Sequence, residues 1–411
     1  MEKINPNLGL SSLLLHAVED DNPHNVNVTP IYQNSTYRIP DVKTGAAIIE
    51  RDVPGYIYSR LSNPNSDQVA NKIAILEGLD LLKANPDKSY EELIGARLYS
   101  SGMAAIMAAI LSRANKSGMK IIAQEALYSN TFTFLKNTFP QYGVETIFLS
   151  DLSLESWEKA FKDHPDATLA YLETPSNPSL NLVDIEGVTE IAHRHNAWVM
   201  ADNTFSTPFC QRPITLGADI IIHSTTKYLN GHGLIIGGAL VTPHLDYLNG
   251  PLYDISNTLG GNPSPFDCWL LNNGLKTFEL RIERQCSSAF QVARFLETHP
   301  MVDFVNYPGL ESHPQHELAK KQMNQYGGMI SFELKGGLKA GETMMNKVGL
   351  CRLAVSLGHI DTLIEHPATL THYKVERDIR YQMGISDGLV RLSIGIENVQ
   401  DIIADLDQAL G

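Results

Sequence analysis

Residues 223–233 read HSTTKYLNGHG and directly follow an apolar run at residues 220–222. They contain one lysine, Lys227, among short hydroxyl side chains. Ser224 and Thr226 are donors of the kind that hold a phosphate, and Gly231 and Gly233 allow a tight turn around a bound group. An exposed charge at the end of a strand is the alternative interpretation. The hydroxyl and glycine pattern favours a ligand site.

An aspartate, Asp202, ends another apolar run upstream, in VMADNTFSTP. A lysine that bonds covalently to an aldehyde and an aspartate that pairs with a protonated ring nitrogen are what pyridoxal 5′-phosphate (PLP) requires from a protein. Lys227 and Asp202 together therefore predict a PLP site.

The composition narrows the class of protein. With 411 residues the chain is long enough for two domains, and 19% charged against 43% hydrophobic residues indicates a globular protein. The net charge of −14 argues against a nucleic-acid partner, which would require a basic face. The 4 cysteines are scattered without a CxxC pair, so neither a metal site nor a disulfide framework is predicted. No signal peptide and no membrane-spanning run is recognised, and we expect a cytoplasmic enzyme.

Strand-like and helix-like segments alternate between about residues 100 and 242. The expected strands cover residues 120–123, 145–149, 168–172, 198–201, 220–222 and 237–241; the expected helices cover residues 100–110, 129–139, 152–161 and 185–195. Such alternation is typical of an α/β fold with a mostly parallel sheet. Cofactors bind at the carboxyl ends of the strands in such sheets. The polar side chains that follow these ends are Tyr128, Asn177, Asp202, Ser224, Thr226 and Lys227.

The flanking regions differ from this pattern. Residues 1–60 are proline-rich and predict an extended arm with one short helix at residues 10–18. A helix at residues 67–78 ends at Gly78. Residues 61–265 are expected to form the large domain. Residues 266–411 are expected to form a long helix at 266–296 and a smaller α+β domain, with strands at 329–334, 353–358 and 389–395 and helices at 341–348 and 399–410.

Two further segments carry candidate binding groups. The sequence SSGMAAI begins a helix with free backbone N–H groups at Gly102 and Met103, which suit a phosphate. Arg391 lies in the apolar strand LVRLS, where an unpaired guanidinium would be costly. A substrate carboxylate or a salt bridge at a sheet edge would each supply its partner.

The chain resembles the Cys/Met-metabolism family of PLP-dependent enzymes along nearly its whole length. The resemblance rests on segments in the family's order: YSRLSNP, SSGMAAI, ETPSNP, ADNTFSTP, HSTTK and SLGHIDTLIEHPATLTH. It implies the aminotransferase-like fold type I, PLP on Lys227, and a homodimer or homotetramer. It also implies that the arm crosses to a neighbouring subunit, where Tyr58 and Arg60 reach the PLP phosphate.

The resemblance further implies roles for residues around the cofactor and the substrate. Tyr128 stacks on the ring and protonates the leaving group, and Asn177 lies beside the ring 3′-oxygen. Arg391, helped by Ser356, holds the α-carboxylate of an amino-acid substrate. Lys227 moves protons at the substrate carbons.

The reaction class follows from the resemblance, with alternatives. The C-terminal third is most similar to methionine γ-lyases, which implies γ-elimination giving 2-oxobutanoate, ammonia and a thiol. γ-Replacement, as in O-acylhomoserine sulfhydrylases or cystathionine γ-synthases, is the alternative. An aminotransferase of the same fold is disfavoured because the γ-family segments are intact. A regulatory protein of this fold is disfavoured because Lys227 and Asp202 are both present. Val355 favours a small uncharged γ substituent. We expect that substituent to face Tyr128, Asn130, Leu234 and Tyr253.

Some positions depart from the methionine γ-lyase pattern. That branch has a cysteine after Tyr–Gly, where this chain has Tyr128, Ser129 and Asn130, so Asn130 takes the place of the cysteine. Leu234 and Tyr253 stand where that branch has an aspartate and a lysine. A stretch around residues 83–95 is an insertion relative to the family. Surface insertions cost little stability, and we assign it no function.

Overall fold

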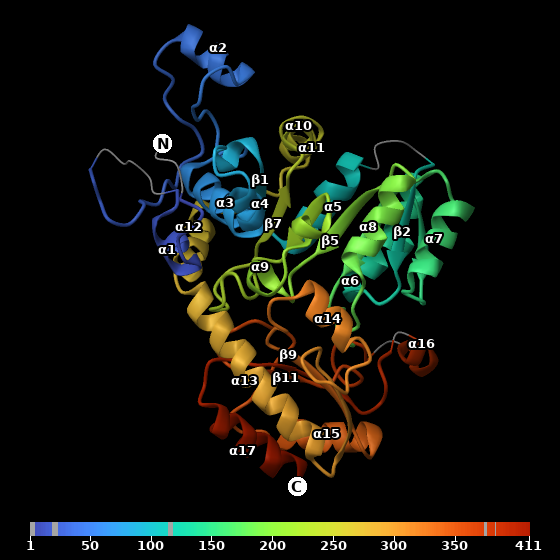
Figure 1. The fold of residues 1–411 in the computed structure, drawn as a ribbon. Coiled ribbons are helices and arrows are strands. Elements are labelled where there is room, and N and C mark those ends of the chain that lie inside the picture. Colours follow the sequence, from blue (N-terminus) through green and yellow to red (C-terminus); the bar gives the residue numbers. More distant parts are fainter. Residues whose placement is uncertain (1–4, 19–23, 114–117, 374–375, 383) are drawn as a thin grey trace.

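The computed structural model describes residues 5–18, 24–113, 118–373, 376–382 and 384–411. The chain builds two sheets, each with its own set of helices (Figure 1). No helix in these described ranges is long and apolar enough to cross a membrane.

The larger sheet has seven strands in the order β1-β7-β6-β5-β4-β2-β3. Its strands are β1 (Gly95–Tyr99), β2 (Lys120–Gln124), β3 (Glu145–Leu149), β4 (Ala167–Glu173), β5 (Trp198–Asp202), β6 (Ile220–His223) and β7 (Gly238–Thr242). The pairs from β3 to β6 are parallel, and β7 runs antiparallel to both of its neighbours. The mostly parallel sheet predicted from the alternating pattern is confirmed.

Both faces of this sheet are covered by helices. Alternate strand residues enter two different cores: Ile121 and Tyr171 pack with Ile106 of α5 (Gly102–Arg113), whereas Ile122 and Leu172 belong to the opposite core. The opposite core is completed by α3 (Pro64–Glu77), α7 (Leu154–Asp163) and α8 (Ile185–Arg194). Burial on both sides explains why these strands are continuous apolar runs.

Short helical segments connect the strands of the large sheet. After β2 come α6 (Ser129–Thr133), a π-helical turn at Phe134–Thr138 and a 3₁₀ turn at Phe139–Tyr142. Elsewhere lie α4 (Leu79–Ala84), a 3₁₀ turn at Tyr90–Glu92, α9 (Thr207–Cys210), a 3₁₀ turn at Pro213–Leu216, α10 (Leu245–Asn249) and α11 (Pro251–Leu259). The proposed insertion at residues 83–95 thus leads through one helical turn into the edge strand β1.

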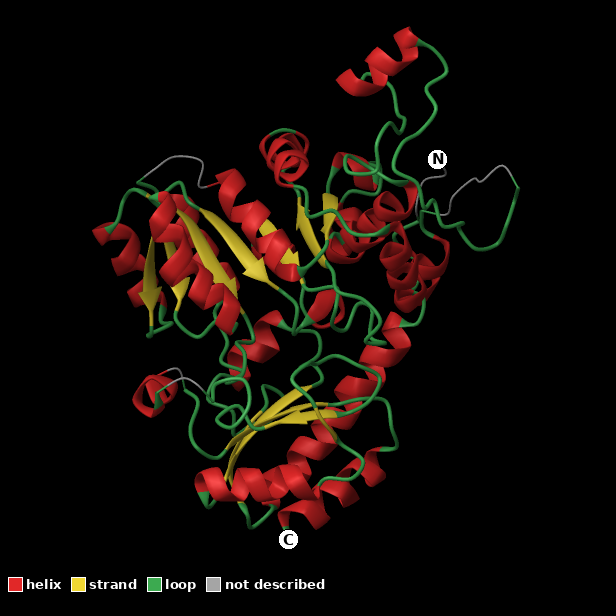
Figure 2. Ribbon diagram, turned by 180° about the vertical axis from the view of Figure 1, so that it is seen from behind, coloured by secondary structure: helices red, strands yellow, loops and turns green. Residues whose placement is uncertain are grey.

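The smaller sheet has the order β10-β11-β12-β9-β8. Its strands are β8 (Val302–Asn306), β9 (Met329–Leu334), β10 (Arg352–Leu353), β11 (Leu363–Glu365) and β12 (Leu389–Ser393). The helices α13 (Phe278–Thr298), α15 (Gly337–Lys347) and α17 (Val399–Leu410) lie together on one face (Figure 2). α14 (His316–Gln322) and α16 (Arg377–Gln382) lie in its connections.

The N-terminal arm contains two helices rather than one. α1 (Leu10–His16) packs against α13, as expected for a short helix near residue 10. α2 (Val42–Glu50) was not predicted and projects away from the rest of the chain (Figure 1). Asp41 caps it by accepting the Thr44 N–H, a signal that the prolines around it obscured.

Two predictions in the C-terminal part are wrong. The long helix at residues 266–296 is two helices, α12 (Pro265–Leu275) and α13, which separate at Lys276 and Thr277. The strand at residues 353–358 shrinks to β10, and Val355 and Ser356 lie in a loop. Strands β1, β8 and β11 were not predicted; β11 has 3 residues, too few for a periodicity of its own.

Candidate active site

The predicted polar residues converge on one cavity of ≈270 Å³ at the carboxyl ends of β2, β4, β5 and β6. The loops after parallel strands meet at one edge of a sheet, which is why residues distant in sequence share this site. The predicted residues among those lining it are Gly102, Met103, Tyr128, Asn177, Asp202, Ser224, Thr226, Lys227 and Arg391.

Lys227 presents its amine to this cavity. Its Nζ donates a hydrogen bond to the Ser356 hydroxyl at 3.0 Å. Burial, with the nearby Arg391 charge, lowers the pKa of Lys227 to about 8. A lowered pKa makes the neutral amine easier to form, and a nucleophile or a base requires that neutral form.

Asp202 closes the end of β5 and lines the same cavity. Its Oδ1 accepts the main-chain N–H of Thr204 at 3.0 Å. Burial raises the pKa of Asp202, and the neighbouring His223 opposes that rise. An enclosed carboxylate of this kind is stabilised by a cationic partner, such as a protonated ring nitrogen.

The start of α5 and the loop after β6 form a cradle suited to a phosphate. Gly102 opens α5, and a Cβ at this position would lie 3.1 Å from the Ser224 Cβ. The Ser224 N–H donates to the Thr204 hydroxyl at 2.8 Å, and the Gly237 N–H donates to the Thr226 hydroxyl at 3.0 Å. The close approach leaves the helix N-terminus facing hydroxyl side chains, the geometry that favours anions.

Tyr128 forms one wall of the cavity and is 40% exposed. Asn130, which does not line the cavity itself, donates from its Nδ2 to the Tyr128 hydroxyl at 3.1 Å. Burial and the nearby Glu173 raise the pKa of Tyr128, so the phenol keeps its proton and remains available as an acid.

Arg391 is buried, with 4% of its surface exposed. Its Nη1 lies 3.2 Å from the Glu365 carboxylate and donates to the Asn177 side chain at 3.0 Å. Its Nη2 donates to the main-chain oxygens of Val355 and Ser356. The salt bridge considered as an alternative partner is therefore present, inside the sheet rather than at its edge, and the guanidinium still lines the cavity.

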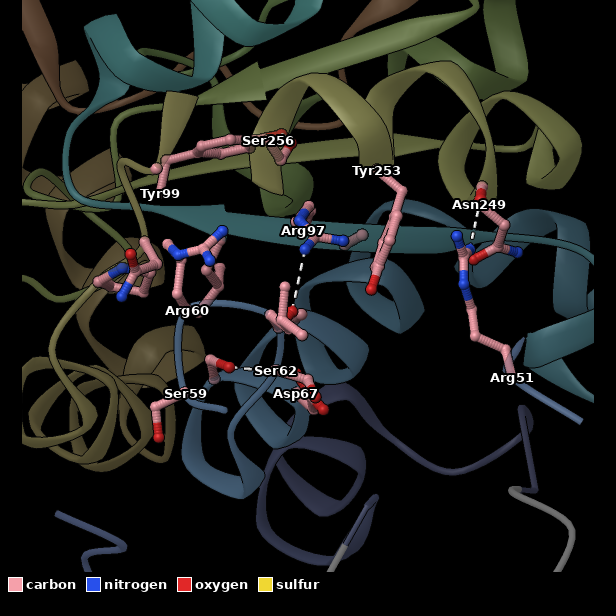
Figure 3. A pocket seen from close by; sticks show the side chains of 18 residues that line it. Arg51, Ser59, Arg60, Ser62, Asp67, Arg97, Tyr99, Asn249, Tyr253 and Ser256 are labelled. Carbon is pink, nitrogen blue, oxygen red and sulfur yellow. Dashed lines mark hydrogen bonds between the residues drawn. The ribbon is translucent and has the colours of Figure 1, made fainter. Parts of the chain in front are cut away.

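Tyr58 and Arg60 do not reach this cavity within one chain. Arg60 lines a separate cavity (Figure 3). Its guanidinium donates to the main-chain oxygen of Asn257. Tyr253 lines that second cavity too, with its ring between the guanidinium groups of Arg51 and Arg97 (Figure 3). The expectation that Tyr253 faces the γ substituent does not hold within a single chain.

Sequence reasoning missed two acidic residues of the site. Glu173 lines the cavity beside Asp202, and Glu365 pairs with Arg391. Glu173 carries the same signal as Asp202, an acid at the end of an apolar run. Glu365 carries no local signal, because its partner lies on another strand.

The cavity fits PLP. It combines the Lys227 amine for the aldehyde, the Asp202 carboxylate for the ring nitrogen, and a phosphate cradle at the N-terminus of α5. When bound, PLP acts as an electron sink for bonds at the α carbon of an amino acid. The fold and this site define a PLP-dependent enzyme acting on an amino acid.

Comparison with known proteins agrees with that class. Residues 11–411 match the model of the Cys/Met metabolism PLP-dependent enzyme family. The chain belongs to this family.

Similar proteins cover nearly the whole chain. It is 45% identical to an L-methionine gamma-lyase of Porphyromonas gingivalis over 98% of this chain and 97% of that protein. It is 40% identical to a cystathionine gamma-lyase of Sus scrofa over 87% of this chain and 84% of that protein. The crystal structure of MetB from Corynebacterium glutamicum superposes with a TM-score of 0.89 at 36% identity, covering 99% of both chains.

Proposed function

We propose that the protein cleaves the bond between the γ carbon and the sulfur of methionine or a closely related amino acid. The products would be 2-oxobutanoate, ammonia and a thiol. The observation that carries this proposal is one cavity that joins the Lys227 amine and the Arg391 guanidinium to a neutral wall. The names of the methionine γ-lyase relatives support the same substrate class.

Each side chain then has a defined task. Asp202 would hold the ring nitrogen of PLP, and Gly102, Met103, Ser224 and Thr226 would hold its phosphate. Arg391 would bind the α-carboxylate through its guanidinium, with Ser356 beside it. Lys227 would take the proton from the α carbon and later a proton from the β carbon, so that the bond between the γ carbon and sulfur can break. Tyr128 would donate a proton to the departing sulfur.

The wall beside these groups determines the preferred substituent. Val355 and Ile236 line the cavity and are 60% and 66% exposed, respectively. Leu234, two residues before Ile236, is exposed but does not line the cavity, so the expectation that it faces the γ substituent does not hold within a single chain. A neutral thioether buries well against such side chains, whereas a second charged amino-acid head would lose hydration without gaining a partner. This favours methionine over cystathionine.

The active unit would be a dimer or a tetramer. The N-terminal arm carries several exposed apolar side chains. Among them are Val28, Val42, Ile49 and Val53, whose exposed fractions range from 41% to 91%. Exposed apolar surface of this kind is typical of a protein–protein contact. The Tyr58 and Arg60 side chains would then complete the phosphate site of the neighbouring subunit.

A cytoplasmic location is part of the proposal. All four cysteines are free and buried, with no disulfide among them. Reduced thiols are typical of a reducing compartment.

A substrate panel tests the proposed reaction. L-methionine, L-homocysteine, L-cystathionine, O-acetylhomoserine and O-succinylhomoserine are each supplied with and without sulfide. Release of 2-oxobutanoate from methionine without sulfide supports the lyase. Homocysteine formed from an O-acylhomoserine only when sulfide is present would replace this proposal with γ-replacement, and fastest turnover of cystathionine would show that the neutral wall does not select the substrate.

A further inference from the structure

Glu173 and Asp202 are neighbours at the edge of the sheet where the cavity opens. Glu173 is the last residue of β4 and Asp202 the last residue of β5. They are directly paired in the parallel β4–β5 ladder, and both line the cavity. Glu173 is 5% exposed. Two carboxyl groups therefore face one cavity, Glu173 buried and Asp202 partly buried.

The Glu173 side chain ties together the two loops that carry Tyr128 and Asn177. Its Oε2 accepts the Tyr128 N–H at 2.8 Å, and its Oε1 accepts the Asn177 N–H at 3.0 Å. The Asn177 side chain in turn accepts a hydrogen bond from Arg391 at 3.0 Å. One carboxyl group thus connects the loops after β2 and β4 with the arginine of the site.

The main chain of Glu173 is fixed as well. The Gln124 side chain accepts the Glu173 N–H at 2.9 Å and donates to the Glu173 carbonyl at 2.8 Å. Gln124 is fully buried at the end of β2. Because both its main chain and its carboxylate are hydrogen-bonded, the Glu173 side chain has little freedom to leave the cavity.

We propose that Glu173 is a positioning residue for the cofactor: it holds Tyr128 and Asn177 in place, and its protonation is coupled to the positive charge that Asp202 binds. The inference deepens the proposed function, since it assumes that PLP occupies this cavity.

The electrostatics follow from the geometry. Burial and the Asp202 charge raise the pKa of Glu173 to about 8, and burial raises the pKa of Asp202. Two adjacent carboxyl groups, of which one is buried, ionise together at a cost in free energy. The other titratable or charged groups around this edge of the sheet are Tyr128, Tyr171, His223, Lys227 and Arg391.

A cation beside Asp202, such as the protonated ring nitrogen of PLP, changes the cost of ionising both carboxyl groups. It offsets the charge of Asp202 and so lowers the pKa of Glu173 from about 8 in the cofactor-free protein. Binding then releases the proton of Glu173 in the pH range between its two pKa values. The contribution of Glu173 to PLP affinity therefore increases as the pH rises, and it becomes constant above about 8.

The test compares the wild type with Glu173→Gln, which imitates the protonated side chain. PLP is added back to the cofactor-free full-length proteins, and the dissociation constant is measured by absorbance from pH 6 to 9. The ratio of the variant's dissociation constant to that of the wild type should increase by about tenfold between pH 6.5 and 8.5, the change that roughly 1.4 kcal/mol produces. The ionisations of PLP itself cancel in this ratio.

Two further variants separate the coupled charge from simple structure. Glu173→Ala also removes the acceptors for the Tyr128 and Asn177 N–H groups, so it should weaken PLP binding at every pH. Glu333→Gln alters an acid whose pKa is also raised by burial but which bonds Ser386 and Gly388 outside the cavity. Its ratio should not change with pH.

A measurement on the wild type alone covers the case in which Glu173→Gln fails to fold. The infrared C=O band of a protonated carboxylic acid should be present at pH 7 in the cofactor-free protein and lost when PLP binds. A ratio that does not vary with pH, or no loss of that band, overturns the inference.

The failure of the inference is distinguishable from failure of the proposed function. If borohydride fixes PLP to Lys227 but the affinity ratio is independent of pH, only the role of Glu173 is wrong. If no PLP is fixed to Lys227, the proposed site itself is wrong.

Discussion

Charge compensation governs the individual residues of this site. Arg391 is held by Glu365 on the neighbouring strand β11, and the two are cross-strand partners. Burial raises the pKa of Glu365, and the Arg391 and Lys227 charges oppose that rise. The cationic group for a substrate carboxylate therefore has a protein carboxylate as its partner before any substrate arrives.

Glu365→Gln should destabilise the protein, because it leaves the Arg391 guanidinium buried without a counter-charge. Removing one partner of a buried pair costs about 3 kcal/mol in the free energy of unfolding. Urea denaturation of the holoenzyme measures this loss.

A substrate-like ligand should restore part of that stability. L-norleucine has the carboxylate of methionine but no sulfur to lose, and it should raise the melting temperature of Glu365→Gln more than that of the wild type. An equal increase in both proteins would argue against Arg391 as the carboxylate site.

At the scale of the elements, the phosphate cradle depends on close packing between the start of α5 and the loop after β6. α5 begins where the loop after β6 passes it, and a side chain at Gly102 would press on Ser224. A helix N-terminus attracts an anion only within its first turn, so the separation of these two segments matters.

Gly102→Ala should weaken PLP binding by about tenfold, which corresponds to roughly 1.4 kcal/mol, because the new Cβ would meet the Ser224 Cβ at 3.1 Å and shift the cradle. Equilibrium binding of PLP to the cofactor-free protein measures the change. Gly349→Ala is the matched control, since a Cβ there would make only an ordinary contact with Asp405 at 3.5 Å. Equal affinities for both variants would contradict the phosphate cradle.

At the scale of the whole molecule, the two cavities of one chain divide the predicted site residues. Lys227 and Arg391 line one cavity, and Arg60 lines the other with Arg51 and Arg97. Within the part of the chain that the structure describes, none of these three arginines forms an ion pair, although Asp67 lines the same cavity. A second copy of the chain is the partner that the proposed function assigns to Arg60.

Subunit mixing tests that assignment. Arg60→Ala and Lys227→Ala should each be inactive. Arg60→Ala removes the phosphate contact to the neighbouring subunit, and Lys227→Ala removes the lysine to which PLP is attached. Mixed dimers should regain up to about half of the sites' activity, since one site then has both residues intact. Steady-state rates after exchange, with exchange confirmed by native mass spectrometry, measure the recovery. No recovery in exchanged dimers would show that each site is built from one chain.

The sequence by itself determined the strands of the large sheet other than β1, and the polar residues at the carboxyl ends of its parallel strands. Tyr128, Asn177, Asp202 and Lys227 could be assigned to one site because apolar runs locate buried strands and parallel strands bring their ends together. The resemblance added Arg391 and Ser356, which lie far along the chain.

Only the tertiary structure decided how these residues are paired. The register of β4 against β5 sets Glu173 beside Asp202, and that of β11 against β12 sets Glu365 beside Arg391. Register depends on contacts between distant segments, which no local pattern encodes. For the same reason, residues 353–358 looked like a strand, but β10 ends at Leu353 and the loop that follows brings Ser356 to Lys227.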